Sequence, residues 1–438
     1  MVSHPKPTTL SPRGNRLATG PTSTMRAMFS QIMLDQYDPD KNPDGIVNLA
    51  PAEDYAMAPT LAARINRTAA SRTLTPDQVG YGEGPWSTAR LRRALARHMN
   101  KYFHPHNPIE EKQLLIANGV GPTCEMVGFS LFDPGDGLLM GRPIYQSFPE
   151  DFGTRAEVRP VWANFPKGVD QFEPGCVEFY ERALLQAQEE GVTVRALLLC
   201  NPHNPLGRCY PKDTIVALMR FCAKYGLHLV ADEVYAVSVY EEEAKFTSVI
   251  SFDCSEYIAP EYVHVMYGLS KDFAAGGLRV GCLYTVNQEL WMAMSAITIF
   301  VWSGAVDGIV ATEILEDEEW LERFFAESKR TLKSRFELTK KLLKEKDVGW
   351  YEGSVAGFFL WADFSRYLKA MGKEDFETEM QLFETFIKRK VVIIPGGMLR
   401  CEEPGWFRIM FAQDERILRE GMKRVFQTLD ELSESSAR

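Results

Sequence analysis

The stretch YGLSKDFAAGGLRVG (residues 267–281) decides the fold and points to the chemistry. It begins inside the apolar run YVHVMYG (262–268), which predicts a buried strand. Lys271 then lies just past the carboxyl end of that strand, where an ammonium group is costly unless it is paired or neutral. A desolvated lysine can form a Schiff base, and Ser270 and Arg279 can both donate to a phosphate. The alternative is an ordinary surface lysine in a loop.

Outward from this stretch, short apolar runs alternate with segments long enough for helices. Repeated strand-then-helix units predict an α/β fold with a mainly parallel sheet that is covered on both faces. The predicted strands are QLLIANG (113–119), GLLMG (137–141), EVRPVWA (157–163), VRALLLC (194–200), LHLVADE (227–233), YVHVMYG (262–268) and GCLYTV (281–286).

The pattern changes after this region. Apolar residues at helical spacing over 309–346 predict one long helix or two joined helices. Three apolar runs, GFFLWADF (357–364), VVIIPGG (391–397) and WFRIMFA (406–412), predict strands, and a helical tail follows Asp414. This region is therefore a smaller α+β domain.

We predict four parts along the chain. Residues 1–24 are rich in Pro, Ser, Thr and Gly and are expected to form a flexible arm. Residues 25–54 are expected to join the small domain. The large domain is expected over 55–308 and the small domain over 309–438.

Composition excludes several classes of protein. The 438 residues are 45% hydrophobic and 25% charged, which are ordinary globular values, and the net charge of −10 disfavours a nucleic-acid partner. No run of 18 apolar residues predicts a membrane span, and the N-terminus lacks the apolar core of a secretory signal. The eight scattered cysteines include no C-x-x-C pair, so we expect reduced thiols in a cytoplasmic protein.

Two further motifs follow predicted strands. NPHNPLG (201–207) makes a rigid turn from which Asn204 could donate to a ligand oxygen, although a plain strand-to-helix turn is the alternative. In ADEVY (231–235), Asp232 is a buried carboxylate that needs a partner. A protonated pyridine nitrogen is one candidate partner, and a helix N-cap role is the alternative.

Three weaker signals complete the set. NGVGPT (118–123) enters a predicted helix, whose first N–H groups form an anion site. Tyr145 could stack on a planar ring or could be a core aromatic. Arg408 alternates with Phe407 and Ile409 in a strand, so it either binds a buried carboxylate or is an exposed edge-strand arginine.

Taken in order, these motifs resemble the class I aminotransferase family of fold-type I pyridoxal phosphate enzymes, and within it the 1-aminocyclopropane-1-carboxylate (ACC) synthase-like branch. The resemblance runs from about residue 25 to the end of the chain. It is carried by YDPDKNPDGIVNL (37–49), DPGD (133–136), NPHNPLG (201–207), ADEVY (231–235), LSKD (269–272) and EPGWFR (403–408).

The resemblance implies which residues meet each part of pyridoxal 5′-phosphate. Lys271 is the lysine that carries the cofactor covalently and is the catalytic base. The other implied contacts are Asp232 to the pyridine nitrogen, Asn204 and Tyr235 near the 3-oxygen, Tyr145 stacked on the ring, and Val120, Gly121, Ser270 and Arg279 around the phosphate.

The resemblance also implies the substrate side and the assembly. Arg408 takes the α-carboxylate of an amino-acid substrate, and Glu53 is a second substrate-binding residue. Tyr81 matches a tyrosine that reaches the neighbouring subunit's cofactor, which implies a homodimer with shared sites. One departure stands out in APAEDY (50–55), where Asp54 occupies the position at which the family has Asn.

Three reactions share the removal of an α-proton by Lys271. A sulfonium leaving group on Cγ leads to a cyclopropane, a thiol leaving group on Cβ leads to β-elimination, and proton return to the cofactor leads to transamination. We expect a carbon–sulfur lyase, a reaction that ACC-synthase-like proteins carry out in fungal secondary metabolism, with a class I aminotransferase as the alternative. No metal site, nucleic acid or membrane partner is predicted.

Overall fold

The computed structural model describes residues 9–20, 29–30, 32–69 and 72–436. Residues 1–8 and 21–24 of the predicted flexible arm lie outside this range. The described part of the arm contains helix α1 (Pro12–Thr19), whose cap residue Ser11 accepts a hydrogen bond from the Gly14 N–H at 3.1 Å. Proline in the first turn and serine at the cap both favour a helix start, so this part of the arm is locally ordered.

The central sheet has seven strands in the order β2-β8-β7-β6-β5-β3-β4. Only β8 runs antiparallel to its neighbours, so the mainly parallel sheet predicted from the sequence is confirmed. The strands are β2 (Leu114–Ala117), β3 (Gly137–Gly141), β4 (Arg159–Ala163), β5 (Val194–Cys200), β6 (His228–Asp232), β7 (Val263–Gly268) and β8 (Gly281–Thr285).

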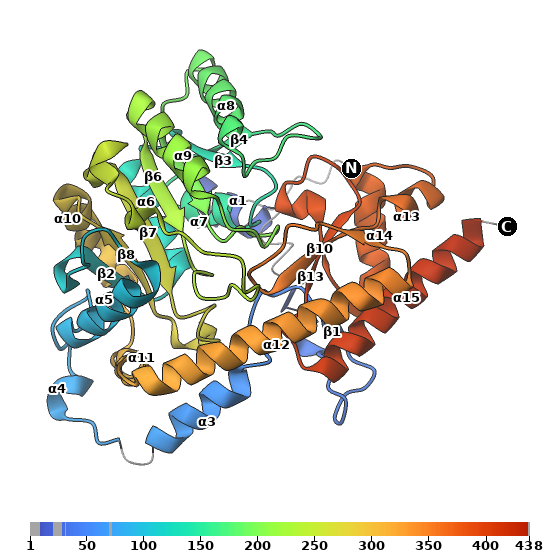
Figure 1. Cartoon of the computed structure of the whole chain (residues 1–438), viewed down its shortest axis with the longest axis horizontal. Coiled ribbons are helices and arrows are strands. Elements are labelled where there is room, and N and C mark those ends of the chain that lie inside the picture. Colours follow the sequence, from blue (N-terminus) through green and yellow to red (C-terminus); the bar gives the residue numbers. More distant parts are fainter. Residues whose placement is uncertain (1–8, 21–28, 31, 70–71, 437–438) are drawn as a thin grey trace.

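Helices cover both faces of this sheet (Figure 1). One face packs against α6 (Val120–Leu131), α7 (Phe148–Gly153) and α10 (Gln288–Ile297). The other face packs against α5 (Ala89–Phe103), α8 (Val177–Glu189), α9 (Lys212–Tyr225) and α11 (Ala305–Glu316). Alternate residues of β2 supply the two cores: Leu114 and Ile116 face one, and Leu115 and Ala117 face the other.

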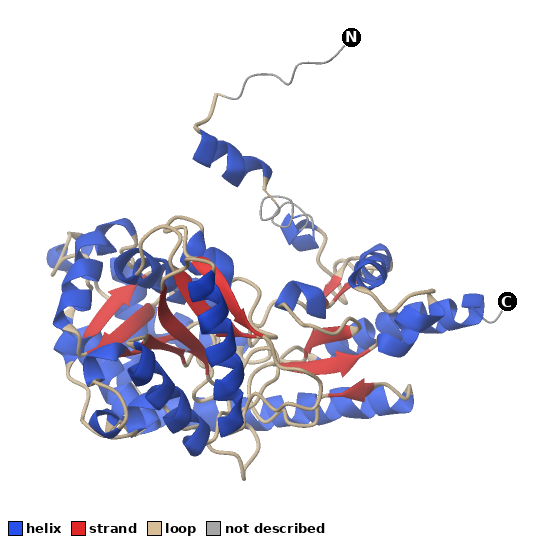
Figure 2. Ribbon diagram, turned by 90° about the horizontal axis from the view of Figure 1, so that it is seen from above, coloured by secondary structure: helices blue, strands red, loops and turns tan. Residues whose placement is uncertain are grey.

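A second, antiparallel sheet lies beside the first (Figure 2). Its strands are ordered β12 (Ile394–Pro395), β13 (Trp406–Met410), β10 (Phe359–Asp363) and β9 (Gly349–Trp350). The run VVIIPGG, expected as one strand, is divided: β11 (Val391–Val392) pairs with β1 (Val47–Asn48), and β12 pairs with β13. The helices of this part are α12 (Glu318–Glu345), α13 (Ser365–Ala370), α14 (Phe376–Lys388) and α15 (Glu415–Ser436).

The helical stretch expected over 309–346 is two joined helices, α11 and α12. They meet at Asp317, whose carboxylate caps α12 by accepting from the Trp320 N–H at 3.2 Å. The same carboxylate pairs at 2.9 Å with Arg64 of α3 (Ala58–Ala69), which α4 (Pro76–Val79) follows. The junction is therefore fixed by a cap and by an ion pair to a third helix.

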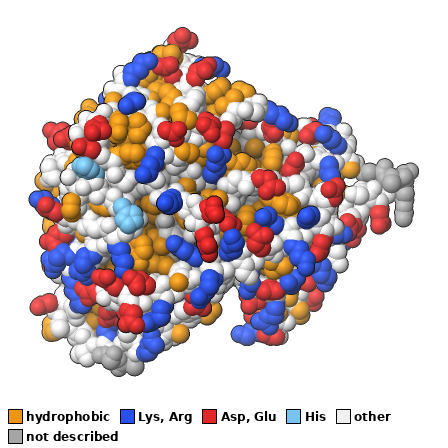
Figure 3. Space-filling model, in the orientation of Figure 1, with side chains coloured by type: hydrophobic (Ala, Val, Ile, Leu, Met, Phe, Trp, Pro, Cys, Tyr) orange, Lys and Arg blue, Asp and Glu red, His pale blue; other side chains and the backbone are white. Residues whose placement is uncertain are grey.

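The surface in the view of Figure 3 carries interspersed acidic and basic side chains. Among the described helices, none has both the length and the apolar composition that crossing a bilayer requires. All eight cysteines are free thiols.

Candidate active site

Lys271 lies on the turn that follows β7, and its side chain is half-buried. Its only hydrogen bond to a described residue goes to the Ala52 carbonyl oxygen, at 2.8 Å. Burial lowers the pKa of Lys271 to about 8, and the charges of Arg408 and Arg279 act in the same direction, against that of Glu53. A large fraction of this amine is neutral near pH 8, which is the form that attacks an aldehyde.

Asp232 is the last residue of β6, and its carboxylate is buried. It accepts one hydrogen bond, from the Val234 N–H at 3.3 Å, and it forms no ion pair with any described residue. Burial raises the pKa of Asp232 to about 7. A buried carboxylate without a cation fits a ligand that brings a protonated nitrogen, so this residue suits the implied cofactor.

The start of α6 forms a concave anion site together with Arg279. Gly119 precedes the helix with a φ of +116° and offers no side-chain cap. A Cβ on Gly119 would overlap the Arg279 guanidinium, and a Cβ on Gly281 would lie 2.7 Å from the Val120 nitrogen. The glycines thus let a cation and the N–H groups of the first helical turn approach one another, and Ser270 sits on the neighbouring turn. This arrangement fits a phosphate.

Arg408 is the third residue of β13 and is only 1% exposed. Its guanidinium donates to Asn204 Oδ1 and to the Ala50 carbonyl oxygen, each at 2.9 Å. Its Nε is buried without a hydrogen-bond partner, and no described carboxylate lies within ion-pair distance. A fully buried cation that is bonded only to neutral oxygens is suited to binding an anion.

The structure brings three further predicted residues to the same place. Asn204 is buried after β5 and contacts Arg408 directly. Tyr235 follows β6, is buried, and meets Phe358 and Phe359 edge-on. Tyr145 is half-buried and edge-on to Phe148. Burial raises the pKa of Tyr145 to about 12, and the positive charge of Arg408 opposes this rise, as it does at Tyr235.

Two predicted residues lie differently. Glu53 is exposed, although its charge raises the pKa of Lys271, so it lies at the rim of the site. Tyr81 is 86% exposed and stacks on Trp302 with ring centroids 5.7 Å apart. Within one chain, Tyr81 shares no hydrogen bond or ring contact with any of the other described candidate residues.

Sequence reasoning missed the role of Asp272, the neighbour of Lys271. Its buried carboxylate accepts from the Ser238 hydroxyl, from the Val237 N–H at 3.0 Å and from the Tyr267 hydroxyl at 2.9 Å. These bonds tie the turn that carries Lys271 to the segment after Tyr235. The aspartate is visible in the LSKD motif, but Val237 and Ser238 lie more than 30 residues away and carry no sequence signal.

The backbone of the segment from Ala50 to Asp54 contacts two of the candidate site residues. The Ala50 and Ala52 carbonyls accept from Arg408 and Lys271, respectively. Asp54, the departure from the family pattern, is buried and accepts from Ser328 Oγ of α12 at 3.0 Å. Burial raises its pKa to about 6. The aspartate therefore anchors the segment to the long helix.

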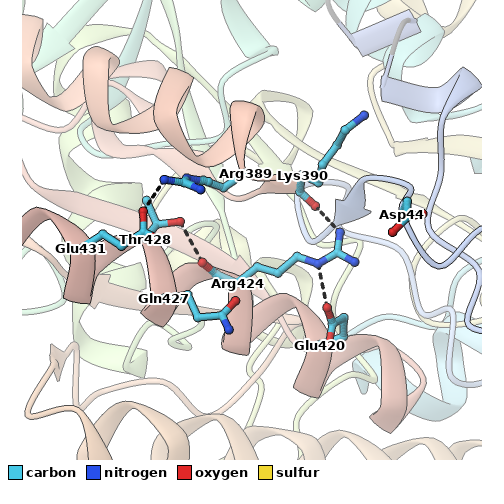
Figure 4. Close-up of a pocket in the computed structure, with 8 residues that line it drawn as sticks. All are labelled: Asp44, Arg389, Lys390, Glu420, Arg424, Gln427, Thr428 and Glu431. Atoms are coloured by element: carbon cyan, nitrogen blue, oxygen red, sulfur yellow. Dashed lines mark hydrogen bonds and ion pairs between the residues drawn. The ribbon is translucent and has the colours of Figure 1, made fainter.

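A separate surface pocket lies where α15 meets β11 (Figure 4). None of the candidate active-site residues lines it. Its cations already have partners, since Arg424 pairs with Glu420, Lys390 with Asp35, and Arg389 with Glu431. The described residues contain no cluster of three or more His, Cys, Asp or Glu side chains that could hold a metal ion.

Comparisons with known proteins show the family of this chain. Residues 67–425 match the model of the family described as aminotransferase class I and II. The chain is 32% identical over 434 residues to 1-aminocyclopropane-1-carboxylate synthase-like protein 1 of Takifugu rubripes, covering 96% of this chain and 68% of that protein. It is 30% identical over 413 residues to a probable inactive 1-aminocyclopropane-1-carboxylate synthase-like protein 2 of Mus musculus, covering 92% and 69%.

The fold also matches solved structures. The aspartate aminotransferase of Thermus thermophilus with maleate superposes with a TM-score of 0.75 at 21% identity, covering 96% of this chain and 100% of that one. At this identity the likeness establishes the fold, which is the fold-type I architecture expected from the sequence.

Proposed function

The chain belongs to the class I and II aminotransferase family, whose cofactor is pyridoxal 5′-phosphate, and we propose that it cleaves a carbon–sulfur bond of an amino-acid substrate. The observation that carries an enzymatic role is Lys271, a half-buried amine whose pKa falls to about 8 and whose only hydrogen bond to a described residue is to a backbone carbonyl. Asp232 and Arg408, which form no ion pair with any described residue, are buried charged groups of the same site. Such an amine beside them is costly to a fold and is explained by the chemistry it supports.

Each candidate residue has a proposed task when the cofactor is bound. Lys271 holds the cofactor, and Asp232 pairs with its ring nitrogen. Tyr145 stacks on the ring, and Asn204 and Tyr235 lie near its 3-oxygen. Val120, Gly121, Ser270 and Arg279 donate to the phosphate. Pyridoxal phosphate supplies an electron sink that stabilises negative charge at the substrate α-carbon.

The protein groups then position and deprotonate the substrate. Arg408 binds the α-carboxylate, because an anion there replaces the Ala50 carbonyl as the partner of a buried guanidinium. The displaced Lys271 amine accepts the α-proton, for which a pKa near 8 is well matched to neutral pH. In β-elimination the α-proton and a sulfur leaving group depart from adjacent carbons, and the freed thiolate takes up a proton.

Carbon–sulfur cleavage is favoured because the relatives above 30% identity are ACC synthase-like by name. Amino-group transfer to a 2-oxo acid is the second candidate, favoured by the family model itself. Both use the same cofactor contacts, and they differ in the step after removal of the α-proton.

One incubation separates the candidates. The purified, cofactor-saturated protein is supplied with S-adenosylmethionine, with cysteine S-conjugates, or with amino acids plus 2-oxoglutarate. A cyclopropane amino acid, or pyruvate with a free thiol, supports the lyase, whereas glutamate supports the aminotransferase. Lys271→Ala controls for background chemistry. A wild type that matches this variant with every substrate would reject both functions.

We also infer a homodimer in the cytoplasm. Tyr81 is exposed, and so are other apolar side chains of the neighbouring segments, namely Val79, Ile299, Phe300 and Val306. Apolar residues gathered on one surface favour an interface, and a second copy would place Tyr81 against the partner's site. Eight free thiols favour a reducing compartment.

A further inference from the structure

A loop between the two sheets carries an unexplained cation. This loop runs from Gly397 to Gly405, just before β13 and Arg408. Both of its ends donate to one carboxylate, with Gly397 N and Gly405 N bonded to the two oxygens of Glu379 at 2.8 and 2.6 Å. Glu379 is fully buried on α14, so the loop is held as a closed unit.

The same loop docks on the segment that leads to Tyr145. The Leu399 carbonyl accepts from the Ile144 N–H at 2.8 Å. Three residues later, Glu402 pairs with Arg142 at 3.0 Å and accepts from the Phe165 N–H at 3.0 Å. The loop residues between these contacts therefore lie against residues 142–144, which directly precede the candidate site residue Tyr145.

Arg400 lies in the chain between Leu399 and Glu402, the two loop residues that make these contacts. It has a φ of +61°, in the left-handed region that non-glycine residues seldom adopt. Its Nε is buried without a hydrogen-bond partner, and it forms no ion pair with any described carboxylate. Its guanidinium lies 5.9 Å from the centre of the Trp162 ring.

Arg142, which lies near the same aromatic ring, differs from Arg400 in having hydrogen-bond partners for its guanidinium. Its guanidinium lies 6.0 Å from the same Trp162 ring, but it donates to Asn164 and to Glu402. Arg400 also lies near Trp162, but it has no described carboxylate as a partner. A left-handed backbone that presents a guanidinium with a buried, unbonded Nε and no described acid as partner favours a ligand-binding role over a structural one.

We propose that Arg400 binds a second carboxylate of the substrate, remote from the α-carbon. This inference rests on the proposed function, since it names the substrate class of the same site. Arg408 takes the α-carboxylate and Arg400 the distal one, so the preferred substrates are amino acids with an acidic side chain, including cysteine S-conjugates that end in a carboxylate.

The test compares an acid with its own amide. S-carboxymethylcysteine and its side-chain amide are matched substrates for carbon–sulfur cleavage, and glutamate and glutamine are matched substrates for transamination. We expect the wild type to favour the acid by about 10- to 100-fold in kcat/KM, the range of a hydrogen bond to a charged group. Arg400→Gln should abolish this ratio, and Arg400→Lys should restore part of it. Arg389→Gln, in the pocket of Figure 4, should leave the ratio unchanged.

A binding measurement removes the dependence on turnover. Calorimetry of the cofactor-loaded protein with glutarate and with pentanoate compares two carboxylates with one. We expect tighter binding of glutarate to the wild type and equal binding of the two ligands to Arg400→Gln.

The outcomes separate the two proposals. Loss of acid preference in Arg400→Gln, with neutral substrates still turned over, supports the inference. An acid-to-amide ratio and a glutarate affinity that do not change in this variant overturn the inference and leave the proposed function standing. A protein that binds no cofactor overturns the proposed function.

Discussion

The two sides of the candidate site are built in different ways. The side that we propose holds the cofactor comprises Asp232, Lys271 and Asp272, which lie at or just after the ends of the neighbouring strands β6 and β7. The side that we propose holds the substrate comprises Arg408, the segment from Ala50 to Asp54 and the loop from Gly397 to Gly405. The first set lies at one edge of one sheet, whereas the second comes from segments more than 300 residues apart.

The two sides also differ in the hydrogen-bond partners of their charged groups. Asp272 has three hydrogen-bond donors that hold the Lys271 turn in place. On the substrate side, Arg408 is satisfied by an amide oxygen and a backbone carbonyl, and Arg400 has no described acid as partner. The residue that only positions its neighbour, Asp272, is therefore fully hydrogen-bonded, whereas Asp232 and Lys271, which we propose meet a ligand directly, have one hydrogen bond each to described residues.

The largest expected effect falls on the cofactor side. Lys271→Ala should remove the visible absorption of the cofactor-loaded protein, because no covalent link can form. Loss of its proton transfer alone should lower kcat by on the order of 10²–10⁴. Spectra and steady-state rates check this, with the exposed Lys245→Ala as control. If the variant kept the absorption band, Lys271 would not be the residue that binds the cofactor covalently.

On the substrate side, Arg408→Ala should weaken amino-acid binding by about 2–5 kcal/mol, the cost of removing one member of a buried charge pair. The cofactor should be retained, since the phosphate contacts lie elsewhere. Titration of the visible band with substrate measures the affinity, and Arg416→Ala is an exposed control. If this variant lost the cofactor but kept its substrate affinity, the assignment of Arg408 to the substrate would be wrong.

The cofactor-free protein can be used to measure how much the buried carboxylate of Asp232 lowers the free energy of unfolding. Its pKa of about 7 in the folded state lies above the ordinary value of 3.8, so the folded state disfavours the ionised form. Stability of the wild type should therefore fall as pH rises from about 4 to 7. Asp232→Asn should be more stable than wild type at pH 8 by on the order of 2–4 kcal/mol, and equal to it near pH 4.

Urea unfolding of the cofactor-free protein at both pH values checks this expectation. The exposed Asp40→Asn controls for the substitution itself. With cofactor bound, the order should reverse, because the ring nitrogen then supplies the missing partner. A stability difference that does not depend on pH would show that Asp232 titrates normally.

The smallest effect tests whether the cofactor side is shared between two chains. A phenol bonded to phosphate contributes about 1.5–3 kcal/mol. If Tyr81 completes the partner's site, mixing inactive Lys271→Ala with inactive Tyr81→Ala should regenerate activity, because one site of the mixed dimer carries neither lesion. Redistributed mixtures that remain as inactive as their parents, or an active monomer in sedimentation, would refute the shared site.

The cofactor side was predictable from the sequence for a physical reason. Strands buried on both faces are continuous apolar runs, so β3 and β5 begin and end at the predicted residues. Motifs at the ends of two predicted strands then place Asp232 and Lys271 at strand ends, and the structure shows that these strands, β6 and β7, are neighbours.

The substrate side was less predictable because tertiary contacts define it. Nothing near Arg408 in the sequence points to Ala50 or Asn204, its two partners. Arg400 carries no sequence signal, since only the structure reveals its backbone conformation and missing partner. The division of VVIIPGG into β11 and β12 likewise results from two different neighbours, β1 and β13.

The cap at Asp317 has a mechanical consequence. Helix α12 has 28 residues and spans both parts of the molecule in Figure 1, so it is a rod about 42 Å long at roughly 1.5 Å per residue. A tilt of about 5° about Asp317 displaces its far end by roughly 4 Å and Ser328 by roughly 1.5 Å. Ser328 is bonded to Asp54, and the chain just before Asp54 carries the carbonyl oxygens that contact Lys271 and Arg408. A tilt of α12 about Asp317 would therefore move the carbonyl oxygens that contact the two cations much less than it moves the far end of the helix.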